Sequence, residues 1–396
     1  MKNIRQWMMT ALGCALLAAC GGGDPTVPGS GTPAGAPTTK GNFTALIVFG
    51  DSLSDVGTYA PVTSATGDGK PPYIGGKFTT NSATGTIWIE NIATTLGLLV
   101  TPAEAGWGAV SGKCPVVAVN PALAPTCTGY GQGGSRVTNP DGIGHDGGKG
   151  ALTVPVKTQI ANHLAKAGGF KDSDLIFVFA GNNDVFVQFG TFAASAAQIQ
   201  ADAAAGKYTA DQANNLLLQA QLTAQEGMKE AAVELSAYIR TEILAKGGKY
   251  VVVFKLSDIA QTPFGQTVPA AAQPVLTTMS QIFNLWLTEG MTNQPVQLVD
   301  TFTLFRAIYA NPGAYGITNA QVPTCDADKI SVITGGQEKT GSSLFCNSTA
   351  GAPYNGMRTG ADANTWFFAD SVHPTTGGHK IFSDEMSKLL KSYGWI

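Results

Sequence analysis

The chain has 396 residues, only 13% of them charged, and a formal net charge of -3. This length allows one large domain or two moderate ones with a sizeable core, and the lack of a basic block or stripe argues against a nucleic-acid partner. Glycine supplies 49 residues and proline 21, which predicts long ordered loops beside the helices and strands.

Residues 1–19 have the pattern of an export signal. Lys2 and Arg5 give a positive start, and the apolar run that follows is too short to span a bilayer. The run ends in Leu-Ala-Ala before Cys20, which resembles the lipobox of bacterial lipoproteins, where cleavage leaves an N-terminal cysteine that carries lipid. An ordinary secretory signal cleaved nearby is the alternative. Gly21 after the cysteine resembles lipoproteins sent to the outer membrane.

Residues 20–41 are rich in Gly, Pro and Thr and predict a flexible tether. We therefore expect residues 42–396 to form a single folded domain, exported and held in the cell envelope by a lipid at Cys20, facing the periplasm or the cell surface. The expected anchor is a lipid and not a transmembrane helix.

Four cysteines lie beyond the signal and the lipid anchor, and an oxidising compartment favours disulfides between them. Pairing Cys114 with Cys127 and Cys325 with Cys346 is the simplest of three connectivities. A zinc site is the alternative, but the spacings are wide and no histidine lies near any of these cysteines. We predict disulfides and no metal.

Apolar runs and helical patterns alternate after the tether and predict a three-layer α/β domain. The expected strands are Ala45–Phe49, Leu175–Ala180, Tyr250–Leu256 and Val296–Asp300. The expected helices are Thr86–Leu96, Val156–Ala167, Gln281–Met291, Thr376–Lys391 and a long helix or helix pair from Asp211 to Lys246. A glycine-rich excursion spans Ala103–Gly150.

An apolar stripe runs along the stretch from Asp211 to Lys246 at steps of three or four residues, with one longer gap. Its members are Leu218, Leu222, Met228, Ala232, Leu235, Ile239 and Ile243. We expect this stripe to pack against the core and not to bind a cofactor.

The first expected strand leads directly into the stretch Phe49–Gly57, FGDSLSDVG. Its serines and aspartates either cap the next helix or place a nucleophile at the carboxyl end of a strand, where open α/β sheets keep their sites. If Ser52 is the nucleophile, it needs a base to take its proton and a partner to orient that base.

Among the four histidines, His373 is the best candidate for this base. Asp370 precedes it by three residues, so the carboxylate can meet Nδ1 and leave Nε2 free for a hydroxyl. His145 lies in a flexible loop, His163 in a helix and His379 in the C-terminal helix, where ordinary structural roles are the better explanation.

Donors for an oxyanion hole are available after the second expected strand and in the glycine-rich excursion. Asn183 follows that strand, and its amide either closes a turn or points into the same crevice as Ser52. We expect the side chain of Asn182 to point elsewhere. Gly133 and Gly134 offer backbone N–H groups.

Two G-x-G-x-x-G matches occur, at residues 129–134 and 142–147. The dinucleotide fingerprint requires a strand before it and a helix after it, and neither match is expected to have both. We predict no nucleotide and no cofactor. The G-x-S-x-G elbow of α/β-hydrolases is absent from the sequence.

Together these residues resemble the GDSL or SGNH hydrolases, specifically the phospholipase/lecithinase/haemolysin-like esterases of bacteria. The resemblance runs from about Phe49 to the C-terminus. It rests on FGDSLSDVG, GKFTTNSATGTIWIENIA, YGQGGSRV, AGNND, LSDIAQTP, NPGAYGITN followed by Cys325, and DSVHPT, in that order.

The resemblance implies a flavodoxin-like, doubly wound and mostly parallel sheet. It implies Ser52 as nucleophile, His373 as base and Asp370 as its orienting partner. The implied oxyanion donors are Gly134, Asn183 and the backbone N–H of Ser52, with Gly133 as the alternative glycine. Two positions depart from the family pattern. Thr58 stands where Asn is usual, and Ala369 replaces a frequent aromatic residue.

We therefore expect a serine esterase of the cell envelope that acts on ester or lipid substrates through an acyl-enzyme. A phospholipase or an acyltransferase with the same residues is one alternative. A surface binding protein that has lost its activity is another, but the presence of every expected catalytic residue type argues against it.

Overall fold

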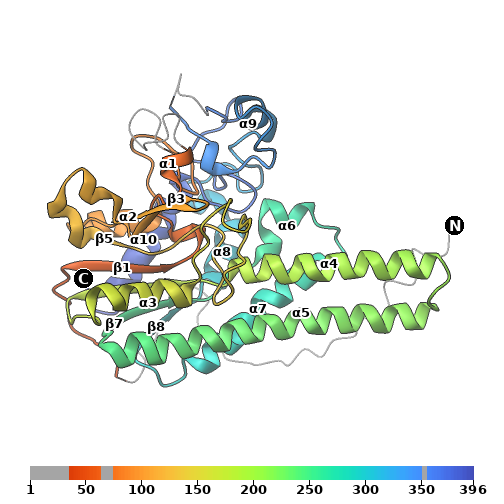
Figure 1. The fold of residues 1–396 in the computed structure, drawn as a ribbon, viewed down its shortest axis with the longest axis horizontal. Helices are drawn as coiled ribbons and strands as arrows, with labels where there is room; N and C mark the ends of the chain where they lie inside the picture. The colour runs from red at the N-terminus through yellow and green to blue at the C-terminus, as the bar shows by residue number, and fades with distance from the viewer. Residues whose placement is uncertain (1–34, 64–74, 350–354) are drawn as a thin grey trace.

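The computed structural model describes residues 35–63, 75–349 and 355–396. The predicted signal peptide, Cys20 and most of the predicted tether lie outside the described residues. A six-stranded sheet runs through the middle of the molecule in the order β2-β5-β1-β6-β7-β8, and every neighbouring pair is parallel (Figure 1). The strands are β1 Ala45–Gly50, β2 Thr101–Pro102, β5 Cys127–Gly129, β6 Asp174–Phe179, β7 Tyr250–Phe254 and β8 Gln297–Val299.

Helices cover both faces of this sheet because alternate residues of a strand point to opposite faces. In β1, Ile47 and Phe49 join one buried cluster, whereas Leu46 and Val48 join the other. The first face is covered by α3 Val156–Ala167, α5 Ala210–Tyr238 and α7 Gln273–Gly290. The second is covered by α2 Trp88–Thr95, α8 Thr301–Ala310 and α10 Thr376–Ser392. The predicted three-layer α/β class is confirmed.

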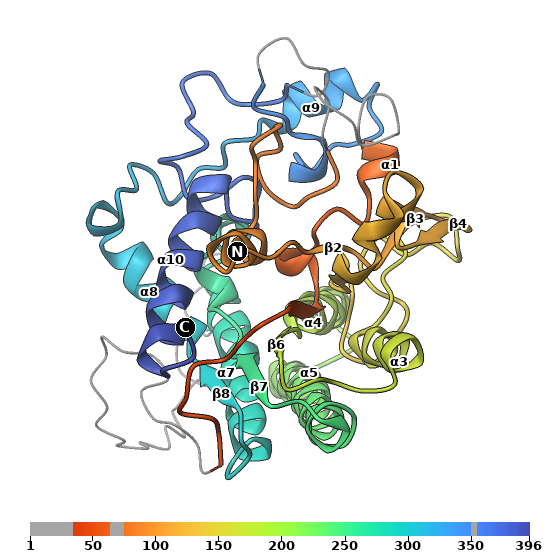
Figure 2. The ribbon, with the colours of Figure 1, turned by 90° about the vertical axis from the view of Figure 1, so that its left-hand side faces the viewer.

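The position of β1 explains where a site forms. Strands β6, β7 and β8 are added on one side of it, whereas β5 and β2 lie on the other (Figure 2). Ligands of doubly wound sheets bind outside the carboxyl ends of the strands where the strand order reverses. The carboxyl end of β1 at Gly50 is such a point, and Ser52 follows it directly.

Two helices of this layer arrangement were not expected from the sequence. Helix α4, Asn182–Ala204, begins inside the stretch that was interpreted as a turn. Helix α8 begins one residue after the end of β8, with only Asp300 between them. Alanine-rich sequence in α4 has high helix propensity and overrides the turn residues at its start. The strands β2 and β5 have two and three residues, which is too short to show a periodic pattern.

Helices α4 and α5 form an antiparallel hairpin that extends well beyond the sheet (Figure 1). The predicted apolar stripe is therefore only partly buried. Met228 and Leu235 pack in the core, but Leu218 and Leu222, near the far end of the hairpin, are 54% and 52% exposed. For these two residues the expectation of core packing was wrong, because periodicity alone does not show how far a helix continues past the body it covers.

The glycine-rich excursion contains an antiparallel hairpin, β3 Glu104–Trp107 and β4 Val110–Lys113. Within the described ranges there are also three short α-helices: α1 Ala60–Thr63, α6 Pro263–Thr267 and α9 Ala327–Ile333. Both predicted disulfides are present, Cys114 with Cys127 and Cys325 with Cys346. Among the helices described, none combines the length and the apolar character needed to cross a membrane.

Candidate active site

The turn after β1 is built around a buried aspartate. Asp51 caps the short helix η2, Ser52–Ser54, by accepting a hydrogen bond from the N–H of Leu53 at 3.1 Å. Its second oxygen accepts from Nδ2 of Asn182 at 2.9 Å. Burial raises the pKa of Asp51 to about 6. These bonds fix the start of η2 and hold Ser52 at the edge of the sheet.

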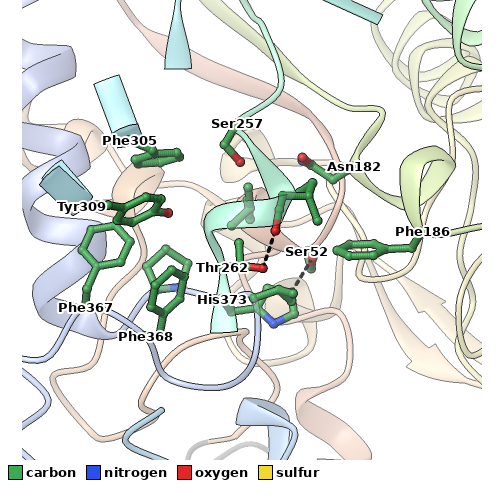
Figure 3. Close-up of a pocket in the computed structure, with 14 residues that line it drawn as sticks. Ser52, Asn182, Phe186, Ser257, Thr262, Phe305, Tyr309, Phe367, Phe368 and His373 are labelled. Atoms are coloured by element: carbon green, nitrogen blue, oxygen red, sulfur yellow. Dashed lines mark hydrogen bonds between the residues drawn. The ribbon is translucent and has the colours of Figure 1, made fainter. Parts of the chain in front are cut away.

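Ser52, His373 and Asp370 lie in one continuous line of hydrogen bonds. Oγ of Ser52 is 2.8 Å from Nε2 of His373 (Figure 3). Nδ1 of His373 is in turn 2.8 Å from Oδ2 of Asp370. An ionised carboxylate can only accept, so the proton of the neutral imidazole is on Nδ1. Nε2 is then left to accept the hydroxyl proton of Ser52.

The carboxylate of Asp370 is buried and accepts three backbone bonds besides the one from the imidazole. Its donors are the N–H groups of Ser343 at 2.9 Å, Val372 at 3.0 Å and His373 at 2.8 Å. Burial alone would raise the pKa of Asp370, but the neighbouring imidazole and these hydrogen bonds outweigh it and hold this pKa well below its usual range. Asp370 therefore stays charged in mildly acidic solution.

The other histidines lie apart from this line. Burial lowers the pKa of His379 to about 3, and its Nε2 is 3.3 Å from the carbonyl oxygen of Phe78. Burial also lowers the pKa of His163 to about 4, where the ring stacks on Phe170. Within the described ranges, no three His, Cys, Asp or Glu side chains are grouped to hold a metal ion.

The two candidate glycines differ in what their N–H groups do. The N–H of Gly133 donates to Oδ2 of Asp55 at 2.8 Å, so it is occupied. No hydrogen bond in the described part of the chain uses the N–H of Gly134. Gly134 has a φ of +79°, and a Cβ there would lie 2.1 Å from the carbonyl oxygen of Ile143, so the loop requires glycine. Burial raises the pKa of Asp55 to about 6.

Asn183 lies beside the same loop. It belongs to the first turn of α4, is buried, and its Nδ2 donates to the carbonyl oxygen of Ser135 at 2.8 Å. A side-chain amide carries two hydrogens, so one remains. Asp184 ties the first turn of α4 to this loop as well, because its carboxylate accepts from Nε of Arg136 at 2.9 Å and from the N–H of Val137 at 3.0 Å.

Asn182 does not point away from the site, and that expectation was wrong. Its side chain lines a pocket together with Ser52 and His373 (Figure 3). As the first residue of α4, it reaches the turn after β1 through its bond to Asp51. Asn182 and Asn183 are adjacent at one strand end, and only the start of the helix decides which side of the chain each one faces.

The pocket beside Ser52 is lined in part by aromatic rings that no motif had indicated. These rings come from three places in the chain: α4, α8 and the stretch before Asp370. The rings are those of Phe186, Phe305, Tyr309, Phe367 and Phe368. The double phenylalanine before Asp370 was visible in the sequence, but α8 was not predicted, and so Phe305 and Tyr309 could not be placed.

The chain matches a family model described as GDSL-like lipase/acylhydrolase over residues 46–386. The chain belongs to this family. It is 21% identical over 383 residues to a phosphatidylcholine-sterol acyltransferase of Aeromonas hydrophila, covering 90% of this chain and 93% of that one. It is 28% identical over 148 residues to the esterase EstA of Pseudomonas aeruginosa and of Pseudomonas putida, covering 36% of this chain and 20% of theirs.

As a member of the GDSL family, the protein is a hydrolase that acts on esters. Its two departures from the family pattern have structural roles. The N–H of Thr58 donates to Asp55 at 2.7 Å and helps to hold the turn after Ser52. The N–H of Ala369 donates to the carbonyl oxygen of His373 at 2.7 Å, which closes the loop that carries Asp370.

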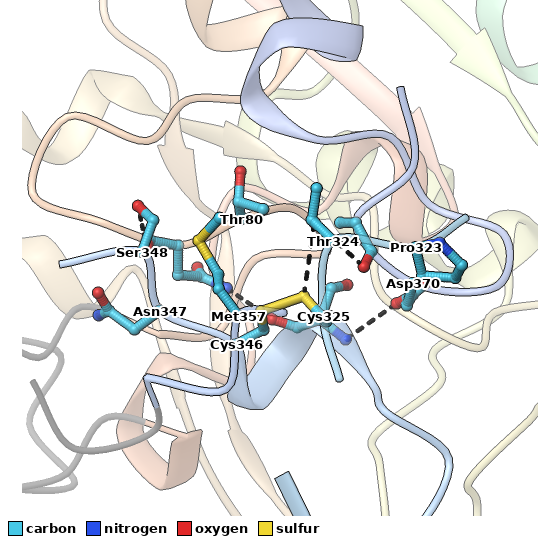
Figure 4. Close-up of a disulfide and its surroundings, with 12 residues drawn as sticks. Thr80, Pro323, Thr324, Cys325, Cys346, Asn347, Ser348, Met357 and Asp370 are labelled. Atoms are coloured by element: carbon cyan, nitrogen blue, oxygen red, sulfur yellow. Dashed lines mark hydrogen bonds between the residues drawn. A yellow bond between two sulfur atoms is a disulfide. The ribbon is translucent and has the colours of Figure 1, made fainter. Parts of the chain in front are cut away.

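The disulfide Cys325–Cys346 joins the two chain segments that hold Asp370 (Figure 4). The N–H of Cys325 donates to the carbonyl oxygen of Ala369 at 2.9 Å, directly before Asp370. Ser343, three residues before Cys346, donates to the carboxylate itself. The other disulfide lies in the excursion, with a separation of 13 residues against 21 here.

We expect the two disulfides to differ in their effect on turnover. Replacing either pair by alanine should cost about 2–4 kcal/mol of unfolding free energy, because each closes a loop in the unfolded chain. Only Cys325→Ala with Cys346→Ala should also lower kcat, by roughly ten- to a hundredfold, since it loosens Asp370. The measurement is kcat at a temperature where both double variants are folded. Equal losses of kcat in the two would contradict this role.

Proposed function

We propose that the protein hydrolyses carboxylic esters through an acyl-enzyme formed on Ser52. The observation that carries the proposal is the 2.8 Å contact between Oγ of Ser52 and Nε2 of His373, together with the bond from Nδ1 to Asp370. A serine hydroxyl becomes a competent nucleophile when a base with a fixed tautomer takes its proton.

In the first step Oγ of Ser52 bonds to the ester carbonyl carbon while its proton passes to Nε2 of His373. Asp370 stabilises the imidazolium because it remains charged. The tetrahedral intermediate then collapses, the C–O bond to the alcohol breaks, and the alcohol leaves with the proton from Nε2. A water molecule repeats these steps on the acyl-enzyme and releases the acid.

The negative charge on the carbonyl oxygen needs donors that are already in place. The N–H of Ser52 is the first of a helix and lacks an intrahelical partner. We assign the other two donors to the N–H of Gly134 and the remaining amide hydrogen of Asn183. Support for this pair is the bond from Asn183 to Ser135, next to Gly134, and the engagement of Gly133 by Asp55.

Acyl transfer to an alcohol is a second candidate for the same site. The Aeromonas hydrophila relative, whose alignment covers 93% of its length, is named an acyltransferase. The first half of the reaction is the same for both outcomes, and the acceptor that reaches the acyl-enzyme decides between them.

We also propose that a lipid on Cys20 holds the protein in the cell envelope. The support is the lipobox-like Leu-Ala-Ala-Cys after a short apolar run and the Gly-, Pro- and Thr-rich stretch that follows it. A disulfide-bonded domain fits an oxidising compartment.

The nucleophile can be tested directly. Ser52→Ala should abolish turnover of p-nitrophenyl esters and labelling by a fluorophosphonate, with an unchanged melting temperature, because only the attacking oxygen is lost. Ser54→Ala is the matched control and should still be labelled. Labelling of the Ser52→Ala protein at any other serine would contradict the assignment.

The pH profile tests the base. A protonated His373 cannot accept the proton of Ser52, so kcat/KM should fall tenfold per pH unit on the acid side. Asp370 does not cause this loss because its lowered pKa keeps it charged there.

Asp51 and Asp55 can also take up a proton in mildly acidic solution, because burial raises their pKa values to about 6. The temperature dependence of the pH profile distinguishes these carboxylates from the histidine, because protonating an imidazole releases much more heat than protonating a carboxylate. The acid limb should therefore move to lower pH on warming. A limb that stays fixed with temperature would assign the titration to a carboxylate.

The two asparagines should respond differently to removal. Asn183→Ala should lower kcat by about 10²–10³ with little change in KM, because the donor gains strength only as the carbonyl oxygen becomes charged. Asn182→Ala alters the pocket and the bond to Asp51, so its effect should fall mainly on KM and on melting temperature. A larger loss of kcat in Asn182→Ala would transfer the oxyanion role to that residue.

A further inference from the structure

The pocket beside Ser52 ends at a wall of aromatic rings that contact one another. Tyr309 lies 5.4 Å from Phe367 and 5.5 Å from Phe368 between ring centroids, and Phe305 lies 6.0 Å from Phe367. Phe305, Phe367 and Phe368 are also core residues of the second face of the sheet. A group that enters past Ser52 therefore meets rings that are fixed by core packing, and we expect these rings to limit the length of the acyl chain.

Polar atoms interrupt this aromatic lining. The carboxylate of Asp51 requires a donor, so Nδ2 of Asn182 faces it and Oδ1 faces the other way. Asn182 is 6% exposed, and its Oδ1 has no hydrogen-bond partner among the described residues. This oxygen is itself buried out of reach of a ligand in the pocket, so the polar atoms that can meet a ligand's acyl chain are hydroxyls.

Two hydroxyls line the same pocket. They belong to Ser257, which follows β7, and to Tyr309, on α8. No hydrogen bond of either hydroxyl is found in the part of the chain that the structure describes. Figure 3 shows the hydroxyl oxygens of Ser257 and Tyr309 on the side of the rings that faces Ser52. An acyl chain with only carbon and hydrogen beyond its carbonyl would leave both hydroxyls without a partner.

We propose that this pocket receives a short acyl group that carries a hydroxyl, aliphatic or phenolic. The hydroxyl forms hydrogen bonds with the hydroxyls of Ser257 and Tyr309, while the rings contact the carbon skeleton. This proposal rests on the proposed function, because it takes Ser52 as the atom that receives the acyl group.

The test compares ethyl esters in matched pairs on the purified full chain. The pairs are 3-hydroxybutanoate with butanoate, and 3-(4-hydroxyphenyl)propanoate with phenylpropanoate. Rates are divided by those of alkaline hydrolysis to remove intrinsic reactivity. In at least one pair, kcat/KM should favour the hydroxylated ester by about three- to tenfold, which is the usual worth of one hydrogen bond. The pair with the larger ratio identifies the aliphatic or the phenolic class. Ethyl dodecanoate should be a poor substrate.

Ser257→Ala combined with Tyr309→Phe should bring the preferred pair's ratio close to one. Tyr393→Phe is the matched control, because it removes a buried tyrosine hydroxyl that has no partner among the described residues and does not line the pocket. It should keep the wild-type ratio. A melting temperature near that of the wild type shows that each variant is folded.

Two results would overturn the proposal: ratios near one for both pairs in the wild type, or a ratio that survives in the double variant. Efficient turnover of the dodecanoate would overturn the short pocket. Failure of the proposed esterase function would look different from these results. In that case no ester would be hydrolysed, or hydrolysis would persist in the Ser52→Ala variant.

Discussion

Asp370 keeps a negative charge although it is buried, because hydrogen-bond donors in the C-terminal part of the protein surround its carboxylate. Removing a carboxylate from water is costly unless hydrogen bonds and a positive or polarisable partner replace the solvent. Here three backbone N–H groups and the imidazole of His373 do so. The proton of His373 is fixed on Nδ1 as a result, and the orientation of Nε2 towards Ser52 follows from it.

Other buried carboxylates along the carboxyl edge of the sheet also accept hydrogen bonds from backbone N–H groups. Asp51 fixes the turn after β1, and Asp55 connects that turn to Gly133. Asp184 connects the start of α4 to the loop that follows Gly134, through the N–H of Val137. Each is a buried carboxylate that accepts backbone N–H groups of a loop. Loops lack the ladders that order strands, so these side chains supply the hydrogen bonds that hold Ser52, Gly134 and Asn183 in one place.

Much of this could be predicted because the relevant signals were local. The continuous apolar runs of β1, β6 and β7 indicated buried parallel strands, and Ser52, Asp370 and His373 each lie in a short motif. What could not be predicted depended on non-local structure. The short strands β2 and β5 form only because they pair with neighbouring strands. The direction of the Asn182 side chain depends on α4 starting at that residue. The pocket walls depend on how α8 packs, which no motif encodes.

The hydrogen bond between Ser52 and His373 joins residues that are 321 positions apart. A chain is synthesised from its N-terminus, so Ser52 is made long before His373 exists. Pairing of β1 with β6 also joins distant segments and is slow compared with helix formation. The nucleophile therefore has no base while the chain is being made, and the hydrolase becomes active only when its last segment docks. A nascent chain that ends before His373 carries the serine motif without the means to activate it.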